Sequence, residues 1–321
     1  MMRPELKDAV VTGCGIAVSG VAGPGDLLAA GRAASAAGFD PETGLRGRDL
    51  RHRDRASRFA LRAAEPALNE AGLSDGERYT GPEHATAVVV SCNLGNLDSV
   101  CQFADTIAEH TVTGLSPLGL PQTSTNEIAG WLAIRYRMRG PNVTLCNGAT
   151  SGLDALHWAA NLIAARRAEV VLVVGVEPDT EPVARLLDDG TGRPRLDGAA
   201  ALVVEAVGHA TRRGVPALAQ LRGYARSPRS DEALARVRAT APGPISLLLA
   251  RDGGPLPGDG RVLDLTARLG HCSGALGVLQ GAAGVSHLRE DSVGAVLAVA
   301  GGEPRDDAAA ALLLTAAAGV S

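Results

Sequence analysis

Short apolar runs alternate with amphipathic stretches along this chain. Runs at 9–12, 85–90, 169–176, 199–204, 245–249, 293–299 and 308–314 predict buried strands. Apolar residues at helical spacing predict helices at 58–71, 152–167 and 274–288. Helices that lie between buried strands predict an α/β fold.

The chain also contains a weak internal repeat. Ala-Thr-Ser-Gly at 149–152 and His-Cys-Ser-Gly at 271–274 each head a predicted helix rich in small residues, and each helix leads to a strand. Two such halves would place both helix heads at one central site. No Ser/Pro-rich linker separates them. We therefore predict a single unit, 1–321, made of two duplicated halves at about 1–195 and 196–321.

The composition is typical of a large globular protein. An apolar content of 45% over 321 residues is enough for a sizeable core, and with only 2% aromatic residues that core must consist of Ala, Val and Leu. The net charge of −4 gives no general attraction to nucleic acid. No run approaches the roughly 20 apolar residues of a membrane span, and 1–8 lacks the apolar region of a signal peptide. We therefore expect a cytoplasmic protein with no membrane segment. The polar segment 224–244 is expected to be irregular.

Signatures of metal or cofactor binding do not occur in the sequence. The five cysteines are scattered without a C-x-x-C pair, and the histidines lack metal-ligand spacing. Gly13-Cys-Gly15 lacks the third glycine of a dinucleotide-binding turn at the required spacing. The serine within 148–152 stands one position too late for a hydrolase nucleophile turn. We predict neither a metal nor a cofactor.

Several segments together resemble the β-ketoacyl synthase family. They are Val-Val-Thr-Gly at 10–13, the arginine-rich helix start at 54–61, Thr-Leu-Cys-Asn-Gly-Ala-Thr-Ser-Gly at 144–152, Gly-Val-Glu at 175–177, the strand at 196–205 and Gly-His-Cys-Ser-Gly-Ala at 270–275. The resemblance covers most of the chain. It implies the thiolase-like fold, a duplicated α/β/α/β/α arrangement, shortened relative to a full ketosynthase.

Four positions of this sequence match the catalytic positions of that family. Ala149 stands where the family has a nucleophilic cysteine, at a helix N-terminus that would favour a thiolate and stabilise an oxyanion. Arg251 and Thr266 stand where the family has a histidine and a lysine, and only His271 is kept. The resemblance therefore implies a member that has no condensing activity of its own.

Two nearby side chains leave alternatives open. Cys146 could be a displaced nucleophile, but it lies at a predicted strand end, and a buried free cysteine is commonly a small apolar filler. His271 could take part in catalysis or could satisfy backbone groups at a helix start. The lack of a cysteine at position 149 favours the structural role.

Within this superfamily, the pattern resembles the chain-length-factor subunits of type II polyketide synthases, including the branch that makes reduced polyene chains. Those subunits pair with a catalytic ketosynthase and close its acyl tunnel, and the aromatic members usually carry glutamine where this chain has Ala149. The resemblance places a tunnel helix at 93–110 and a partner-interface loop at 115–127. The implied tunnel residues are Ser99, Val100, Phe103 and Thr106, and the implied interface residues are Leu115, Pro117, Pro121, Thr123 and Asn126. Ordinary packing of these residues is the alternative.

An excess of arginine between positions 45 and 62 predicts a positive patch. Arg51, Arg53 and Arg55 belong to it and would attract an acidic acyl carrier protein. The alternative is a solvated helix start with ion pairs inside the chain.

The resemblance implies that this chain determines chain length as the partner of a ketosynthase in polyketide or fatty-acyl biosynthesis. Its partners would be that ketosynthase, an acyl carrier protein and the growing polyketide chain. Two alternatives stay open: a free-standing acyltransferase or decarboxylase that uses His271, and a scaffold that only docks the carrier protein.

Overall fold

The structure, a computed structural model, describes residues 6–29, 40–41, 43, 53–76, 78–188, 190, 192–250, 260–291 and 294–317. The first elements are β1 (Ala9–Val18), α1 (Arg55–Glu70), β2 (Thr86–Ser91), α2 (Leu97–His110), α3 (Glu127–Tyr136), β3 (Asn142–Leu145), α4 (Ser151–Ala164), β4 (Val170–Glu177), α5 (Glu181–Leu186) and β5 (Gly198–Ala206). They are followed by α6 (Val207–Arg213), β6 (Ala219–Ser227), α7 (Ser230–Arg238), β7 (Ile245–Leu249), β8 (Arg261–Leu263), α8 (Leu265–Leu269), α9 (Leu276–Glu290), β9 (Ala295–Gly301) and β10 (Ala309–Thr315). Short 3₁₀ helices include η5 (Val112–Gly114), η6 (Pro117–Thr123), η7 (Gly148–Thr150) and η8 (Ser273–Ala275).

The strands form a ten-stranded sheet in the order β3-β2-β4-β5-β1-β6-β10-β9-β7-β8. From β1 outward, β5 pairs antiparallel with β1 on one side and with β4 on the other, and β4, β2 and β3 are parallel. From β6 outward, β6, β10, β9, β7 and β8 repeat this pattern. The pairs Val10–Gln220 and Val11–Ala219 join the two sides. We propose from this repeat that the halves of the chain meet between β5 and β6, not near residue 195, because β5 completes the first set of strands.

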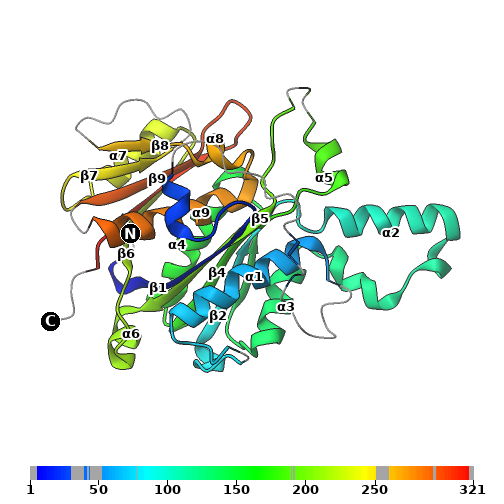
Figure 1. Ribbon diagram of the computed structural model, residues 1–321, viewed down its shortest axis with the longest axis horizontal. Helices are drawn as coiled ribbons and strands as arrows, with labels where there is room; N and C mark the ends of the chain where they lie inside the picture. The colour runs from blue at the N-terminus through cyan, green and yellow to red at the C-terminus, as the bar shows by residue number, and fades with distance from the viewer. Residues whose placement is uncertain are drawn as a thin grey trace.

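Helices cover both faces of each side of the sheet. α4 and α9 lie against each other in the middle of the molecule, between the two sides, and share one core with the strands (Figure 1). α1 and α3 cover the outer face of the first side, where Phe59 is fully buried. α7 covers the outer face of the second side. The result is the five-layered helix, sheet, helix, sheet, helix arrangement that the family resemblance implies.

Because both faces of the sheet are covered, the strands are continuous apolar runs. In β2, Val89 belongs to the central core, while Val88 and Val90 belong to the core under α1. A strand that is buried on both faces gains nothing from alternating polar residues. The apolar runs predicted from the sequence are therefore confirmed as β1, β2, β4, β5, β7, β9 and β10, with shifted ends in all of them except β7.

The prediction that 224–244 is irregular is wrong. The segment contains the end of β6 and the whole of α7. β6 alternates buried residues with more exposed ones such as Arg222 and Arg226, and α7 buries Ala233 and Val237. Both elements have one face exposed to solvent, so polar residues interrupt their buried ones.

Glycines allow the two central helices to touch. A Cβ atom on Gly152 of α4 would lie 2.6 Å from the backbone nitrogen of Gly277 in α9. A Cβ atom on Gly277 would lie 2.2 Å from the backbone nitrogen of Leu153. Separations this short are far below van der Waals contact. The heads of α4 and α9 therefore cross with backbone against backbone.

Candidate functional site

The turn before α4 is the position where the family resemblance places a nucleophile. β3 ends at Leu145, and η7 leads directly into α4. Gly148 adopts a left-handed φ of 72°, which glycine tolerates without strain. Ala149 follows and is half-buried, but its methyl group can neither donate, accept nor attack. The turn is thus formed without a reacting group.

Asn93 joins this turn to the head of α9. Its Nδ2 donates to the carbonyl oxygen of Gly148 and to Oγ of Ser273, each at 2.9 Å. Its Oδ1 accepts from the Gly148 N–H and from Oγ of Ser151, each at 3.2 Å. One amide side chain therefore fixes both helix heads.

The two helix heads have matching backbone geometry. Ser273 has a φ of 43° and opens η8, as Gly148 opens η7. This pairing matches Ala149 with Gly274. The repeat recognised in the sequence had instead aligned Ala149 with His271, three residues away from the structural match.

Glu177, at the end of β4, joins the chain after β2 to the head of α9. Its carboxylate accepts from the backbone N–H groups of Asn93 at 2.7 Å, Gly274 at 3.0 Å and Leu94 at 3.1 Å. Burial nevertheless raises the pKa of Glu177 to about 7. Glu177 is therefore a buried acid that gives up its proton less readily than an exposed glutamate, next to the turn that lacks a nucleophile.

Asp154 fixes the other side of the turn. It is buried in α4 and accepts from Nδ2 of Asn147 at 3.0 Å, from Oγ1 of Thr150 at 2.9 Å and from the hydroxyl of Tyr224. The ring of Tyr224 stacks on His157, with 3.9 Å between the ring centroids. Burial lowers the pKa of His157, so its ring is neutral at pH 7.

Sequence reasoning did not select Asn93, Asp154 or Glu177 as site residues. Asn93 and Glu177 occur within two residues of the ends of apolar strands, which is a recognisable signal. Asp154 follows Thr150 by one helical turn, so its contact with that residue could also have been anticipated.

The other catalytic positions have different surroundings. His271 pairs through its main chain with the preceding segment, since its N–H donates to the oxygen of Pro194 at 2.8 Å and its oxygen accepts from the Leu196 N–H at 2.9 Å. Thr266 is buried at the start of α8, where its N–H and hydroxyl donate to Asp264 at 2.7 and 2.8 Å. His271 thus lies two residues before the joined turns, while Thr266 belongs to a helix cap. Arg251 lies outside the described residues.

Cys146 is exposed, so its interpretation as a buried apolar filler is wrong. Its thiol donates to the carbonyl oxygen of Cys92 at 3.0 Å. Partial burial of the thiol group and the nearby Glu177 raise the pKa of Cys146, which disfavours the thiolate that a nucleophile needs.

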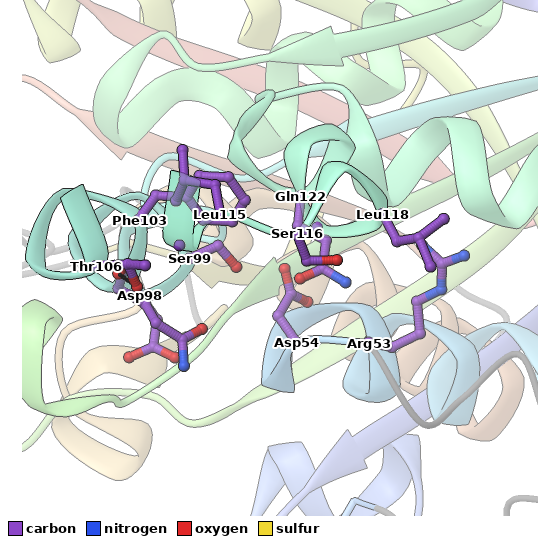
Figure 2. Close-up of a pocket in the computed structure, with 13 residues that line it drawn as sticks. Arg53, Asp54, Asp98, Ser99, Phe103, Thr106, Leu115, Ser116, Leu118 and Gln122 are labelled. Atoms are coloured by element: carbon purple, nitrogen blue, oxygen red, sulfur yellow. Dashed lines mark hydrogen bonds between the residues drawn. The ribbon is translucent and has the colours of Figure 1, made fainter. Parts of the chain in front are cut away.

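A cavity of about 520 Å³ lies between α2, the chain after it and the start of α1 (Figure 2). Ser99, Phe103 and Thr106 line it from α2, and the ring of Phe103 lies over Gly119 of η6. Val100 is not among the described lining residues and is 40% exposed. The structure therefore groups three of the four predicted tunnel residues around one cavity.

The rest of the cavity lining is mostly polar. Asp98 and Gln102 contribute to it from α2, and Arg53, Asp54, Ser116 and Gln122 from the other segments. Burial raises the pKa of Asp54 to about 6, helped by the neighbouring Glu127.

The predicted interface residues lie in the segment that returns from α2 to α3. Leu115 lines the cavity. Pro117, Pro121 and Asn126 are exposed, and Thr123 is partly exposed, with its hydroxyl donating to the oxygen of Leu120 at 2.8 Å. Their assignment to a partner interface stays a prediction.

Two arginines of the predicted docking patch form ion pairs within the chain. Nη1 of Arg53 lies 2.5 Å from Glu127, and its guanidinium stands over the ring of Trp131. Arg55 makes a two-pronged contact with Asp197, with Nε 2.8 Å from Oδ1 and Nη2 2.5 Å from Oδ2. These contacts support the alternative of a helix start held by ion pairs. Arg51 lies outside the described residues.

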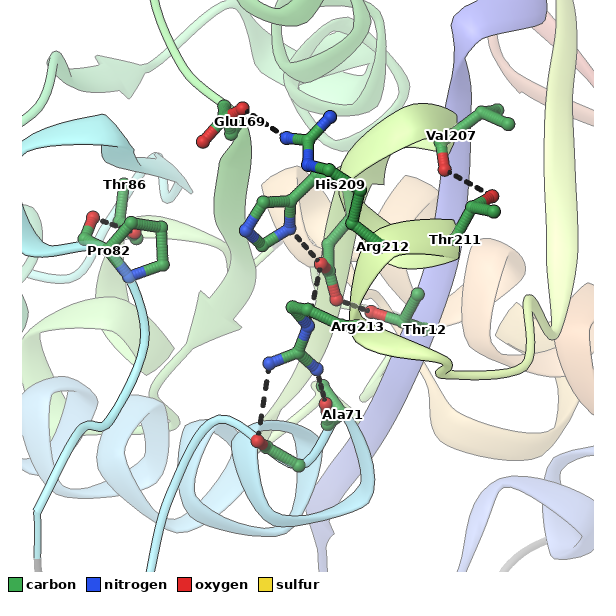
Figure 3. A network of polar contacts seen from close by, with 12 residues as sticks. Thr12, Ala71, Pro82, Thr86, Glu169, Val207, His209, Thr211, Arg212 and Arg213 are labelled. Carbon is green, nitrogen blue, oxygen red and sulfur yellow. Dashed lines mark hydrogen bonds and ion pairs between the residues drawn. The ribbon is translucent and has the colours of Figure 1, made fainter.

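A separate buried network surrounds Glu205 of β5 (Figure 3). Glu205 pairs with Val170 at the start of β4, whereas Glu177 lies at the end of that strand. Glu205 accepts from Thr12 at 2.6 Å and contacts Nδ1 of His209 at 2.5 Å and Nε of Arg213 at 3.3 Å. Arg213 also donates to the carbonyl oxygens of Ala71 and Gly72, which directly follow α1. This network fastens β1, β5, α6 and α1 together and does not belong to the candidate site.

No described helix is both long enough and apolar enough to cross a membrane. Within the described ranges, no group of three His, Cys, Asp or Glu side chains is placed to hold a metal ion.

Known proteins resemble this chain in both sequence and structure. It is 27% identical over 212 residues to 3-oxoacyl-[acyl-carrier-protein] synthase 2 of Vibrio cholerae, covering 59% of this chain and 50% of that protein. It is 29% identical over 277 residues to the tetracenomycin polyketide synthase ketoacyl synthase alpha subunit of Streptomyces glaucescens, covering 70% of this chain and 64% of that protein. The chain thus spans about half the length of the first curated relative and less than two thirds of the second.

The fold comparison agrees with the layers described above. The solved structure described as the ishigamide ketosynthase/chain length factor superposes with a TM-score of 0.78 at 23% identity, over 97% of this chain and 100% of that one. The fold is therefore thiolase-like, as predicted from the sequence. The sequence profile described as "Beta-ketoacyl synthase, N-terminal domain" matches residues 19–190. Because this match covers more than half of the 321 residues, the chain belongs to the β-ketoacyl synthase family.

Proposed function

We propose that this chain is a non-catalytic, chain-length-determining partner of a ketosynthase in type II polyketide or fatty-acyl biosynthesis. The observation that carries the proposal is Ala149. The turn keeps its left-handed Gly148 and its bonds to Asn93, yet it lacks a nucleophile. An acyl chain cannot be held covalently on its methyl group, which supports action through another subunit.

An exposed apolar surface supports such a subunit contact. We call residues 97–123, which comprise α2, η5 and η6, the α2 lobe; it extends away from the body of the molecule (Figure 1). Its exposed large apolar residues are Val100, Ile107, Val112, Leu118 and Leu120, which are 40% to 81% exposed. Apolar groups gathered in this way commonly mark a protein interface. β3 is an edge strand of the sheet and offers backbone groups for pairing.

The cavity in the α2 lobe supports a role in chain length. If the partner's acyl tunnel opens onto it, Ser99, Phe103 and Thr106 form the floor, and Phe103 is the only large apolar side chain among them. Val100, which is exposed on another face of α2, then contributes to docking and not to the floor.

The remaining partners belong to the same proposal. The growing polyketide chain would enter the cavity, and an acyl carrier protein would deliver its extender units in the cytoplasm. Docking of the carrier protein through Arg53 and Arg55 would be weak, because carboxylates of this chain already neutralise both side chains.

Co-expression with each ketosynthase encoded beside this chain tests the proposal. We expect one of them to copurify in a 1:1 complex whose product distribution differs from that of the ketosynthase alone. Acyl transfer by the purified chain without a partner would favour the free-standing enzyme. Binding of carrier protein with no effect on product length would favour the scaffold.

A further inference from the structure

Exposed arginines gather where the parallel strands of the first side begin. They are Arg137, Arg139, Arg166, Arg167 and Arg212. The register brings their segments together, because Thr86 at the start of β2 pairs with Val170 of β4, and Val88 pairs with Asn142 of β3. We call the surface formed by these five side chains the arginine end. It lies at the opposite end of the strands from the turn before α4, so it is separate from the candidate site.

Carboxylates neutralise only part of the charge of the arginine end. Glu83 lies 3.2 Å from Nε of Arg137 and 3.8 Å from Nε of Arg139. Glu169 accepts from Arg212 at 2.7 Å (Figure 3). The other two arginines have no carboxylate partner among the described residues. Five arginines and two glutamates leave a net charge of +3 here, although the whole chain carries −4.

Two of these arginines stand at helix ends that favour glycine. Arg137 directly follows α3 with a φ of 57°, and Arg166 follows α4 by two residues with a φ of 55°. A residue with a Cβ atom is strained in this left-handed region, which is why glycine is common there. A positive charge also suits the dipole of a helix end, but Arg139 and Arg167 supply that charge beside each helix without such strain. Strained positions of this kind point to a function beyond folding.

We infer that the arginine end is a docking surface for an acidic protein, whose carboxylates pair with the guanidinium groups that this chain leaves unneutralised. A guanidinium group presents its N–H donors in the geometry that a carboxylate accepts. Glu83 and Glu169 add acceptors among these donors, which fits the mixed polar face of a protein better than a uniformly anionic membrane. The inference goes beyond the proposed function and does not depend on it, because the arginine end lies away from the α2 lobe.

Binding of a fluorescent polyglutamate peptide tests the inference. The chain is used alone, or in its ketosynthase complex where that complex forms, so a failure of the proposed function would not affect the test. We expect Arg166→Gln with Arg167→Gln to weaken binding about tenfold at about 50 mM salt, where charges are weakly screened. Arg229→Gln with Arg236→Gln is the control, since these exposed arginines at α7 carry the same charge, and it should bind as wild type does.

Three outcomes of the binding experiment would overturn the inference. One is equal weakening in both double variants, and another is a wild-type chain that does not bind the peptide. The third is tighter binding of the wild type to phosphatidylglycerol vesicles than to the peptide, which would replace the acidic protein by a membrane.

Glycine substitutions distinguish docking from a structural role. Arg137→Gly and Arg166→Gly relieve the left-handed strain, so each should raise the melting temperature by about 2 °C while weakening peptide binding. Arg135→Gly, inside α3, is the control and should lower the melting temperature, because glycine is unfavourable within a helix. A lower melting temperature in all three variants would show that the arginines serve the helix ends, and would overturn the inference.

Discussion

At the scale of single residues, this chain keeps the scaffold of a nucleophile turn and lacks its reacting atom. Asn93 and Asp154 bond directly to the turn, and Glu177 bonds to the backbone N–H groups of Asn93 and of Gly274 beside it. These bonds shape the backbone whether position 149 holds a thiol or a methyl group. The shape of the turn is therefore no evidence for a reacting group at position 149.

Restoring the thiol should not restore condensation. We expect Ala149→Cys, made together with Cys146→Ser to remove the exposed thiol, to react with iodoacetamide but not to elongate an acyl chain. The reason is that Thr266 is bonded to Asp264 and arginine occupies position 251. Mass spectrometry and a condensation assay measure the two results. Substantial elongation would mean that the two positions were misassigned, and an acyl adduct of the wild-type chain at Cys146 or Ser151 would contradict its proposed inactivity.

The raised pKa of Glu177 predicts a dependence of stability on pH. The folded chain binds this proton more tightly than the unfolded chain, whose glutamate has a pKa near 4.3, so the stabilisation is complete below about pH 4 and is lost as the pH rises to about 7. The free energy of unfolding should therefore fall by on the order of 3 kcal/mol across this window. Urea unfolding at about pH 5 and about pH 7.5 measures the change.

Two variants separate Glu177 from the other buried carboxyl in this pH window. Glu177→Gln should make the free energy of unfolding depend less on pH. Asp54→Asn should remove only the smaller part of this dependence that comes from Asp54, whose pKa is about 6. An unchanged slope in Glu177→Gln would show that another group is responsible.

At the scale of elements, the crossing of α4 and α9 tolerates no side chain. We expect Gly152→Ala and Gly277→Ala each to lower the free energy of unfolding by at least about 2 kcal/mol, because the new Cβ meets backbone atoms that cannot move away independently. Gly130→Ala in α3 is the matched control: a Cβ there meets nothing within 4 Å, and alanine should stabilise the helix by about 0.5–1 kcal/mol. Equal losses at all three sites would mean that the helix crossing does not explain the glycines.

Phe103 allows a test of the cavity as the tunnel floor. In an assembled complex, we expect Phe103→Ala to lengthen the product, because a longer apolar chain can fill the space and each extra buried CH₂ contributes about 0.8 kcal/mol. Val100→Ala is the matched control, since Val100 lies on the same helix outside the cavity lining, and its product distribution should not change. Product mass spectrometry distinguishes the two variants. An unchanged distribution in Phe103→Ala would leave this side chain a packing role over Gly119.

How far the elements could be predicted depended on their burial. Strands such as β7, buried between layers, are visible as apolar runs, and 245–249 was predicted with the observed bounds. β6 was missed because half of its residues are polar, and the short edge strand β3 contains too few residues for any period to show. The contacts of Asn93 with Gly148 and Ser273 join residues 55 and 180 positions apart, and no local pattern contains such information.

At the scale of the whole molecule, the two halves of the chain share one central core, and the whole chain should need a partner subunit. Leu118 and Leu120 are 81% and 59% exposed in the α2 lobe. Obligate interfaces bury on the order of 2,000 Å² or more of largely apolar surface, so we expect the chain to be poorly soluble or self-associated when made alone. Co-expression with its ketosynthase should rescue it as a 1:1 complex, as size-exclusion chromatography with mass detection would show.

Serine substitutions test whether the α2 lobe makes this contact without altering its charge. We expect Leu118→Ser with Leu120→Ser to abolish copurification of the ketosynthase, because the apolar contact is lost while the carboxylates stay. Val262→Ser in β8 is the control, since Val262 is also exposed, at 38%, but lies outside the lobe. Copurification that survives the double substitution would place the interface elsewhere. A stable monomer that ignores every ketosynthase offered to it would leave the free-standing enzyme as the better account of this chain.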